Sequence, residues 1–438
     1  MRVSPVNRNA KYLLYGIREV VEVAQDIKKL EPSFKIIWEN IGDPVEKGWK
    51  VPDFVREILS ELLVENEVFG YCHSSGVLEA REWVAQYSRF FSPSSTIGPD
   101  DIVFVNGLGA GINILYRMLP KGFRVLQPSP CYPAHSSTES FYSASKSLFY
   151  RLDYNNNWQP DVEHIKWQVK NNSKVGAILL INPGNPTGSV IEKCYLEEIV
   201  KIAEENKLML ISDEVYFRIV FNGVQYTHIT ELAHGRVPLV VLRGASKDIP
   251  WPGSRCGWLE FHNLELNEKF REYFENIKKP LRLEVCATTL PQMAIPKIYS
   301  HPEFEKWLKE YTKRLEENSN LICDILSKAE VLKVNRLKGA FYIMIVFKEG
   351  ILSRKQKVDI ASGKIAKFIE EITSSRRLPL DKRFVYYILA STGICVVPAS
   401  DFSAFFDGFR VTALEYSEEN LVQTYNTLVE AIRKYIAS

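Results

Sequence analysis

The chain has 438 residues, of which 46% are hydrophobic and 25% are charged, and its formal net charge is +2. This composition is ordinary for a globular protein, and the length allows two or three domains with a large core. Because the charges nearly balance, neither nucleic acid nor an anionic membrane surface is expected as a partner.

The cysteines and the apolar segments indicate the cellular compartment of the protein. The seven cysteines are scattered and form no CxxC pair, which argues against a disulfide framework and against a zinc knuckle, so no metal site is expected. Free thiols suit a reducing cytosol. The N-terminal segment lacks the apolar core of a signal peptide, and no run of about 18 apolar residues occurs. We therefore expect a cytoplasmic protein without a membrane partner.

In chain order, the first elements are helical. Residues 15–29 predict a helix, followed by irregular chain to residue 51, and residues 52–87 are helical apart from a break at GYCHSSG (70–76). Short apolar runs then alternate with helical patterns, which is typical of a mostly parallel sheet with helices on both faces. The expected strands are 101–105, 124–128, 147–152, 175–181, 208–212, 239–243 and 256–261, and helices between them include 109–119, 133–144 and 192–206.

The last third of the chain changes character. Long helices are predicted over 267–279, 287–299 and 304–326, then strands at 331–334, 340–347, 393–398 and 408–413, then a closing helix at 417–436. We interpret 51–305 as a large α/β domain and 306–438 as a smaller α+β domain, to which residues 1–50 also belong. The basic stretch 354–384 is expected to be a solvated helix and loop.

A lysine among small residues carries the first chemical signal. Lys247 follows the predicted strand LVVLR within GASKDIPWPGSRCGW (244–258). Small neighbours allow a bulky ring to approach the backbone, and a partly desolvated lysine can form a Schiff base with an aldehyde.

Two further motifs follow predicted strands. INPGNPTGSV (181–190) is a rigid turn at a strand end, where ligands bind in parallel sheets. In SDEVYF (212–217), Asp213 and Tyr216 lie just past a strand, and an acid there can keep a heterocyclic nitrogen protonated. The alternative for Asp213 is a turn cap.

FVNGLGAGIN (104–113) joins a strand to a helix, and such a junction offers backbone amides to a phosphate. A nicotinamide dinucleotide site is not expected, because the glycine spacing is wrong and the next strand supplies no acid.

These segments, in this order, resemble the class I and II aminotransferases of pyridoxal-phosphate fold type I, from NIGDP (40–44) to the FR at 409–410. The resemblance implies pyridoxal 5'-phosphate as cofactor and amino-acid and 2-oxo-acid substrates.

It also implies roles around the cofactor ring. Lys247 matches the Schiff-base lysine, and Asp213 the partner of the pyridine nitrogen. Tyr216 and Asn185 match the residues that bond the ring's phenolic oxygen, and Tyr132 the stacking aromatic.

The resemblance assigns a second group of residues to the phosphate. Arg255 matches the arginine that clamps it, Asn106, Gly107 and Leu108 match the loop that cradles it, and Ser246 could add a hydroxyl. The family often has a serine or threonine where Leu108 stands. Arg255 and backbone amides are therefore expected to carry more of the phosphate binding here.

The remaining matches concern substrate and partner. Arg410 matches the arginine that binds the substrate α-carboxylate, together with Gly42 and Asn185. Tyr71 resembles a tyrosine that reaches the phosphate from the partner subunit, which implies a homodimer with shared sites. Pro250-Trp251-Pro252 departs from the family pattern.

The expected chemistry is amino transfer, with Lys247 as general base and acid at the substrate α-carbon. A β-eliminating or cyclising lyase would use the same residues, because a fold does not fix the reaction. A remote alternative is an amino-acid-sensing regulator, but we expect no room for a DNA-binding module. The sequence leaves the amino donor and keto acceptor open, as it does any role of Trp251, Arg282 or Glu284.

Overall fold

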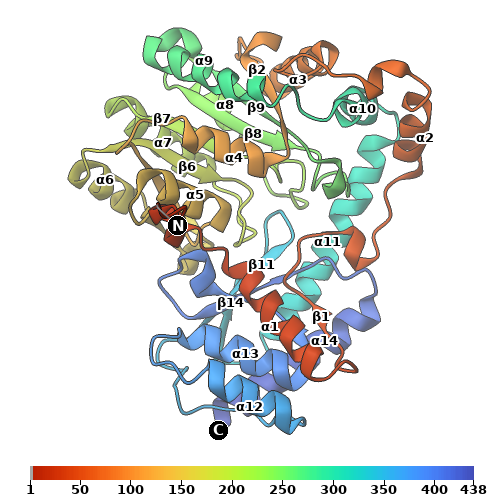
Figure 1. Cartoon of the computed structure of the whole chain (residues 1–438), viewed down its shortest axis with the longest axis vertical. Coiled ribbons are helices and arrows are strands. Elements are labelled where there is room, and N and C mark those ends of the chain that lie inside the picture. The colour runs from red at the N-terminus through yellow and green to blue at the C-terminus, as the bar shows by residue number, and fades with distance from the viewer. Residues whose placement is uncertain (1–2) are drawn as a thin grey trace.

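The computed structural model describes residues 3–438 and divides into an upper region around a large sheet and a lower region around a small one (Figure 1). The large sheet has eight strands in the order β2-β9-β8-β7-β6-β3-β4-β5. The strands are β2 (Ile102–Asn106), β3 (Arg124–Ser129), β4 (Leu148–Asp153), β5 (Gln159–Pro160), β6 (Val175–Ile181), β7 (Met209–Asp213), β8 (Leu239–Gly244) and β9 (Cys256–His262).

Most of this sheet is parallel. Strands β3, β4, β6, β7 and β8 are parallel neighbours, whereas β9 runs antiparallel between β8 and β2, and β5 is antiparallel to β4. Strand β6 (VGAILLI) is a nearly continuous apolar run, as expected of a parallel strand with both faces covered. The mostly parallel sheet that the sequence predicts is confirmed.

Helices cover both faces of the sheet. One buried cluster joins it to α4, α5 and α9, and another joins it to α6, α7 and α8. The helices of this region are α2 (Asp53–Leu62), α3 (Leu78–Phe91), α4 (Leu108–Arg117), α5 (Pro133–Ser143), α6 (Val162–Asn171), α7 (Lys193–Glu205), α8 (Ile229–Ala233), α9 (Glu268–Leu283) and α10 (Thr289–Tyr299).

The lower region contains a four-stranded antiparallel sheet and a two-stranded parallel one. Their strands are β10 (Leu332–Val334), β11 (Tyr342–Phe347), β14 (Gly408–Thr412) and β13 (Val397–Pro398), and separately β1 (Ile37–Trp38) with β12 (Ile394–Cys395). The helices are α1 (Gly16–Leu30), α11 (Phe304–Leu326), α12 (Gly363–Ile372), α13 (Leu380–Thr392) and α14 (Glu418–Ala437). Helix α11 runs from the upper region to the lower one (Figure 1).

Three sequence expectations about this region need correction. The expected strand 393–398 is two short strands in different sheets, because β12 pairs with β1 and β13 with β14. The segment before residue 51, expected to be irregular, contributes β1. The basic stretch is only partly solvated, since Lys382 and Arg383 on α13 are buried. Lys382 can be buried because it pairs with Glu19 and Asp401.

The N-terminal segment packs with the lower region through α1 and β1, and its assignment to the smaller domain stays a prediction. The expected boundary at residue 305 falls at the beginning of α11, and the exact domain limits stay a prediction. Within residues 3–438, no helix combines the length and apolar character needed to span a bilayer.

Candidate active site

A cavity of about 380 Å³ lies where the parallel strands end. Strands β6, β7 and β8 end at Ile181, Asp213 and Gly244, so the segments that follow them meet at one edge of the sheet. Arg255 precedes antiparallel β9, whose beginning lies at the same edge. Among the residues proposed from the sequence, those that line the cavity are Gly42, Leu108, Tyr132, Asn185, Asp213, Tyr216, Ser246, Lys247, Arg255 and Arg410.

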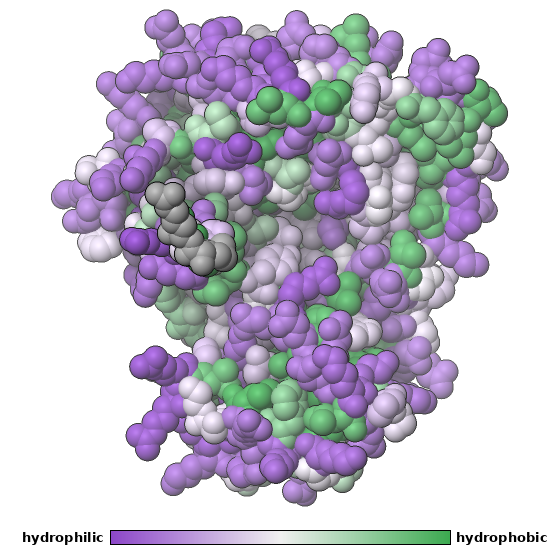
Figure 2. Space-filling model, in the orientation of Figure 1, coloured by the Kyte–Doolittle hydropathy of each residue, from purple (hydrophilic) through white to green (hydrophobic). Residues whose placement is uncertain are grey.

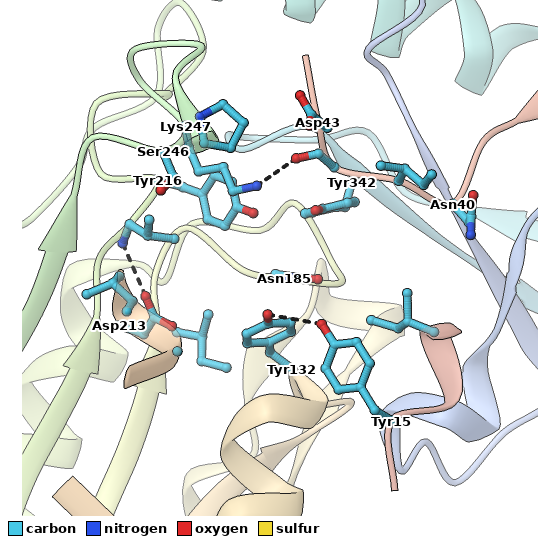
Figure 3. Close-up of a pocket in the computed structure, with 18 of the residues that line it drawn as sticks. Tyr15, Asn40, Asp43, Tyr132, Asn185, Asp213, Tyr216, Ser246, Lys247 and Tyr342 are labelled. Carbon is cyan, nitrogen blue, oxygen red and sulfur yellow. Dashed lines mark hydrogen bonds between the residues drawn. The ribbon is translucent and has the colours of Figure 1, made fainter. Parts of the chain in front are cut away.

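Lys247 is half-buried and points into this cavity (Figure 3). Its Nζ donates a hydrogen bond to the carbonyl oxygen of Gly42 at 2.6 Å, and no carboxylate within residues 3–438 forms an ion pair with it. The next residue, Asp248, is buried and accepts hydrogen bonds from the Tyr299 hydroxyl at 2.9 and 3.0 Å. The backbone next to Lys247 is therefore anchored, while its amine lines the cavity and bonds only to a neutral carbonyl oxygen.

Asp213 is only 4% exposed, and both of its carboxylate oxygens have donors. Oδ1 accepts from the backbone N–H of Val215 at 3.2 Å, and Oδ2 lies 3.0 Å from Nε2 of His135. The Tyr116 hydroxyl lies 3.1 Å from the other ring nitrogen of His135. If that hydroxyl donates to Nδ1, the proton of His135 is on Nε2 and points at Asp213. This chain of bonds fixes the carboxylate at the cavity wall.

Two neighbouring tyrosines of the cavity, Tyr216 and Tyr342, have perturbed pKa values, and their ring centroids lie 6.0 Å apart. Burial raises the pKa of Tyr216 well above its usual range, and the neighbouring phenol of Tyr342 adds to this. Burial also acts to raise the pKa of Tyr342, but the charges of Lys247 and Arg410 outweigh it, so the net shift is downward. Tyr342 is therefore the phenol that gives up its proton more readily.

Arg410 on β14 is 1% exposed and has no carboxylate partner among the described residues. Its Nη1 donates to Oδ1 of Asn185 at 3.0 Å, and its Nη2 donates to the carbonyl oxygen of Asn40 at 2.7 Å. The ring of Tyr342 lies 4.0 Å from the guanidinium carbon, and Nε lacks any hydrogen-bond partner. A buried cation held by neutral groups is suited to an anion that arrives in the cavity.

A second cationic end is formed by Arg255 and the beginning of α4. Gly107 precedes α4 with a φ of +78°, and a Cβ placed there would lie 2.2 Å from Nη2 of Arg255. Glycine is thus required both by the backbone and by the close guanidinium. Leu108 and Gly109 line the cavity in the first turn of α4, where free N–H groups favour an anion.

Comparisons with known proteins show which family the chain belongs to. Residues 36–428 match the model of the family described as aminotransferase class I and II. An uncharacterized aminotransferase of Methanocaldococcus jannaschii is 41% identical over 436 residues, which cover 100% of both chains. The glutamate-pyruvate aminotransferase AlaA of Haemophilus influenzae is 29% identical over 99% of this chain and 98% of its own. The solved alanine aminotransferase of Pyrococcus furiosus superposes with a TM-score of 0.84 at 27% identity, covering 98% of this chain and 99% of that one.

The chain belongs to the class I and II aminotransferase family.

The resemblance stated from the sequence is thereby confirmed, as are the enzyme class and the fold type I architecture. Three proposed site residues lie outside the cavity of this aminotransferase. Gly107 is in close contact with Arg255 but does not line the cavity. The side chain of Asn106 accepts hydrogen bonds from the N–H and hydroxyl of Thr288, before α10. Tyr71 is 86% exposed and does not line the cavity of its own chain.

The structure also locates the three residues whose roles the sequence left open. Trp251 is half-buried and packs against the main hydrophobic core, as a packed aromatic would. Arg282 and Glu284 are exposed at the end of α9 and do not line this cavity.

Sequence reasoning missed several residues of the aminotransferase site. No sequence motif marks these residues, which are Tyr342, His135, Tyr116 and Tyr15. Tyr15 lines the cavity and its hydroxyl lies 3.1 Å from that of Tyr132 (Figure 3). Only the long-range contacts identify these residues.

Proposed function

We propose that this aminotransferase holds pyridoxal 5'-phosphate on Lys247 and moves an amino group between an L-amino acid and a 2-oxo acid. The observation that carries the proposal is that one cavity contains the amine of Lys247, the fixed carboxylate of Asp213 and the guanidinium of Arg410. Neither cation forms an ion pair within residues 3–438. These groups are the ones required to attach an aldehyde, to hold a ring nitrogen protonated and to bind a carboxylate.

The residues present fit the cofactor. Arg255 and the amides at the beginning of α4 suit its phosphate, and Gly107 leaves the space that a side chain would fill. Asp213 also lines the cavity, where its bond to His135 orients the carboxylate for a pyridinium. Tyr132 supplies a ring for stacking, and Tyr216 and Asn185 supply hydrogen bonds to the phenolic oxygen. The cofactor, when bound, supplies an electron sink for the substrate's α-carbon.

The side chains then have separate tasks. With the cofactor bound, Nζ of Lys247 would be the base that removes the substrate's α-proton and the acid that returns a proton later in the transfer. Arg410 binds the α-carboxylate with the help of Asn185. The backbone at Gly42, whose carbonyl oxygen accepts from Lys247, lies beside that carboxylate. Asp213 would pair with the ring nitrogen and favour its protonated form, because a neighbouring carboxylate stabilises a positive charge.

We also propose that the enzyme is a cytoplasmic homodimer whose subunits share sites. Leu63, Val64 and Phe69 lie near Tyr71 in sequence, and each is exposed. Figure 2 shows hydrophobic side chains gathered on the part of the surface over α2. Burial of such a surface against a second copy would explain its exposure in the single chain and bring Tyr71 to the partner's phosphate. The scattered free cysteines support a reducing compartment.

The test is amino transfer by the purified protein supplied with pyridoxal 5'-phosphate. L-Glutamate and pyruvate should yield 2-oxoglutarate and alanine in equal amounts, and Lys247→Ala should abolish the reaction. Release of ammonia and a keto acid without an acceptor would instead indicate the lyase alternative. Absence of both reactions with a panel of amino acids would refute the proposal.

A further inference from the structure

Two cysteines from distant parts of the chain lie close together beside the loop of Tyr71. Cys72 belongs to the loop before α3, and Cys286 belongs to the connection between α9 and α10. Both are partly exposed, whereas Cys194 on α7 is exposed and the other four cysteines are buried. We propose that Cys72 and Cys286 form a reversible intrachain disulfide when the protein meets an oxidising low-molecular-weight disulfide. This modification does not depend on the cofactor.

Hydrogen bonds join the two segments that carry these thiols. Sγ of Cys72 lies 3.8 Å from the carbonyl oxygen of Ala287, the residue that follows Cys286. The hydroxyl of Thr289 donates to the carbonyl oxygen of Gly70 at 2.8 Å. The segments are therefore bonded at two points close to the cysteines, and the thiols cannot separate without breaking these contacts.

Gln292 on α10 fixes the position of the Cys72 thiol. It is fully buried, and its Nε2 donates to the carbonyl oxygen of Ala287 at 3.0 Å and lies 3.6 Å from Sγ of Cys72. Its Oε1 accepts from the backbone N–H of Val77 at 2.9 Å, so both ends of the amide are held. Burial raises the pKa of Cys72, and the closeness of the Cys286 thiol raises it further. The two sulfur atoms are therefore neighbours in the reduced protein.

The backbone just before Cys286 is strained. Val285 has a φ of +73°, which is costly for a β-branched side chain. Its side chain is 46% exposed, so burial of that side chain does not account for the strain. The turn instead places the thiol of Cys286 against the loop that holds Cys72.

The reaction is thiol–disulfide exchange in two steps. The thiolate of Cys286 attacks one sulfur of the small disulfide, so that a mixed disulfide forms and one small thiolate leaves. The thiolate of Cys72 then attacks Sγ of Cys286, and the second small thiolate leaves. Two protein thiols are oxidised, one small disulfide is reduced to two thiols, and these take up the two protons released. In a reducing compartment the bond forms only when the ratio of small disulfide to small thiol rises.

The experiment exposes the holoenzyme to oxidised glutathione, blocks the remaining thiols with iodoacetamide, and maps the peptides by mass spectrometry without reduction. We expect one cross-linked peptide pair that contains Cys72 and Cys286, and recovery of both thiols with dithiothreitol. Because the bond closes a long loop of the unfolded chain, oxidation should raise the unfolding temperature by several degrees.

Cys72→Ser and Cys286→Ser should show neither the cross-link nor the shift in unfolding temperature. Cys194→Ser is the matched control, because it removes an exposed thiol from α7 and should behave as the wild type does.

Three results would overturn the inference, and the first two come from the wild-type protein alone. One is glutathione attached to Cys194 with no cross-link between Cys72 and Cys286. Another is a disulfide that joins two chains, seen as a covalent dimer on a non-reducing gel. The third is an oxidised protein that unfolds at the same or a lower temperature, which would show that the folded structure does not accommodate the bond.

Discussion

At the residue scale, Gly42 lies so close to Tyr342 that position 42 has no space for a side chain. A Cβ at Gly42 would lie 1.8 Å from the hydroxyl oxygen of Tyr342 and 2.8 Å from its Cζ. Gly42→Ala should therefore lower the free energy of unfolding by about 1–3 kcal/mol and reduce kcat/KM. In the double variant with Tyr342→Phe, part of both losses should be recovered, because the nearer atom is gone. Strictly additive losses in chemical denaturation would contradict this contact.

Asp248 gives a prediction about pH at the same scale. Burial raises its pKa to about 6, against the opposing effects of the Tyr299 hydrogen bond and Arg218. The folded protein then binds this proton more tightly than the unfolded chain does. The associated stability is fully present below about pH 4 and is lost as the pH rises through 6. Asp248→Asn keeps the shape without the charge.

The free energy of unfolding of Asp248→Asn, minus that of the wild type, should therefore rise between pH 4 and pH 7 by up to about 3 kcal/mol. Urea denaturation at several pH values measures this difference. A difference that is constant with pH would show that Asp248 is ionised in the folded protein with an ordinary pKa.

At the element scale, α5 supports the end of β7. His135 on α5 bonds to Asp213, and Tyr116 on α4 bonds to His135. His135→Ala should lower kcat/KM by about tenfold, the cost of one hydrogen bond to a charged group. His135→Gln should restore part of the loss, because its amide can donate to the same oxygen. If His135→Ala retained full activity, Asp213 would not need this support.

The elements themselves were largely predictable, because buried strands such as β6 and β8 consist mostly of apolar residues and are followed by turn residues. The residues of the site that follow strands, such as Asn185 and Asp213, were predictable for the same reason. The division of residues 393–398 into β12 and β13 was not, since it depends on partners far away in sequence. Burial of Lys382 likewise depends on Glu19, and the places of Tyr342 and His135 depend on tertiary contacts.

At the scale of the whole molecule, the single chain leaves Tyr71 fully outside its own cavity. We predict that the protein sediments at twice its chain mass of 50.3 kDa. Tyr71→Phe should weaken binding of pyridoxal 5'-phosphate several-fold, by loss of a hydrogen bond to the phosphate, without changing the mass. Sedimentation as a monomer with full activity would contradict shared sites.

The central claim is that Lys247 carries the cofactor, and borohydride reduction tests it most directly. Reduction of the holoenzyme followed by peptide mass spectrometry should place a stable pyridoxyl-phosphate group on Lys247, with the label lost in Lys247→Ala. A label on another lysine, or no label on a protein that transfers amino groups, would contradict the account.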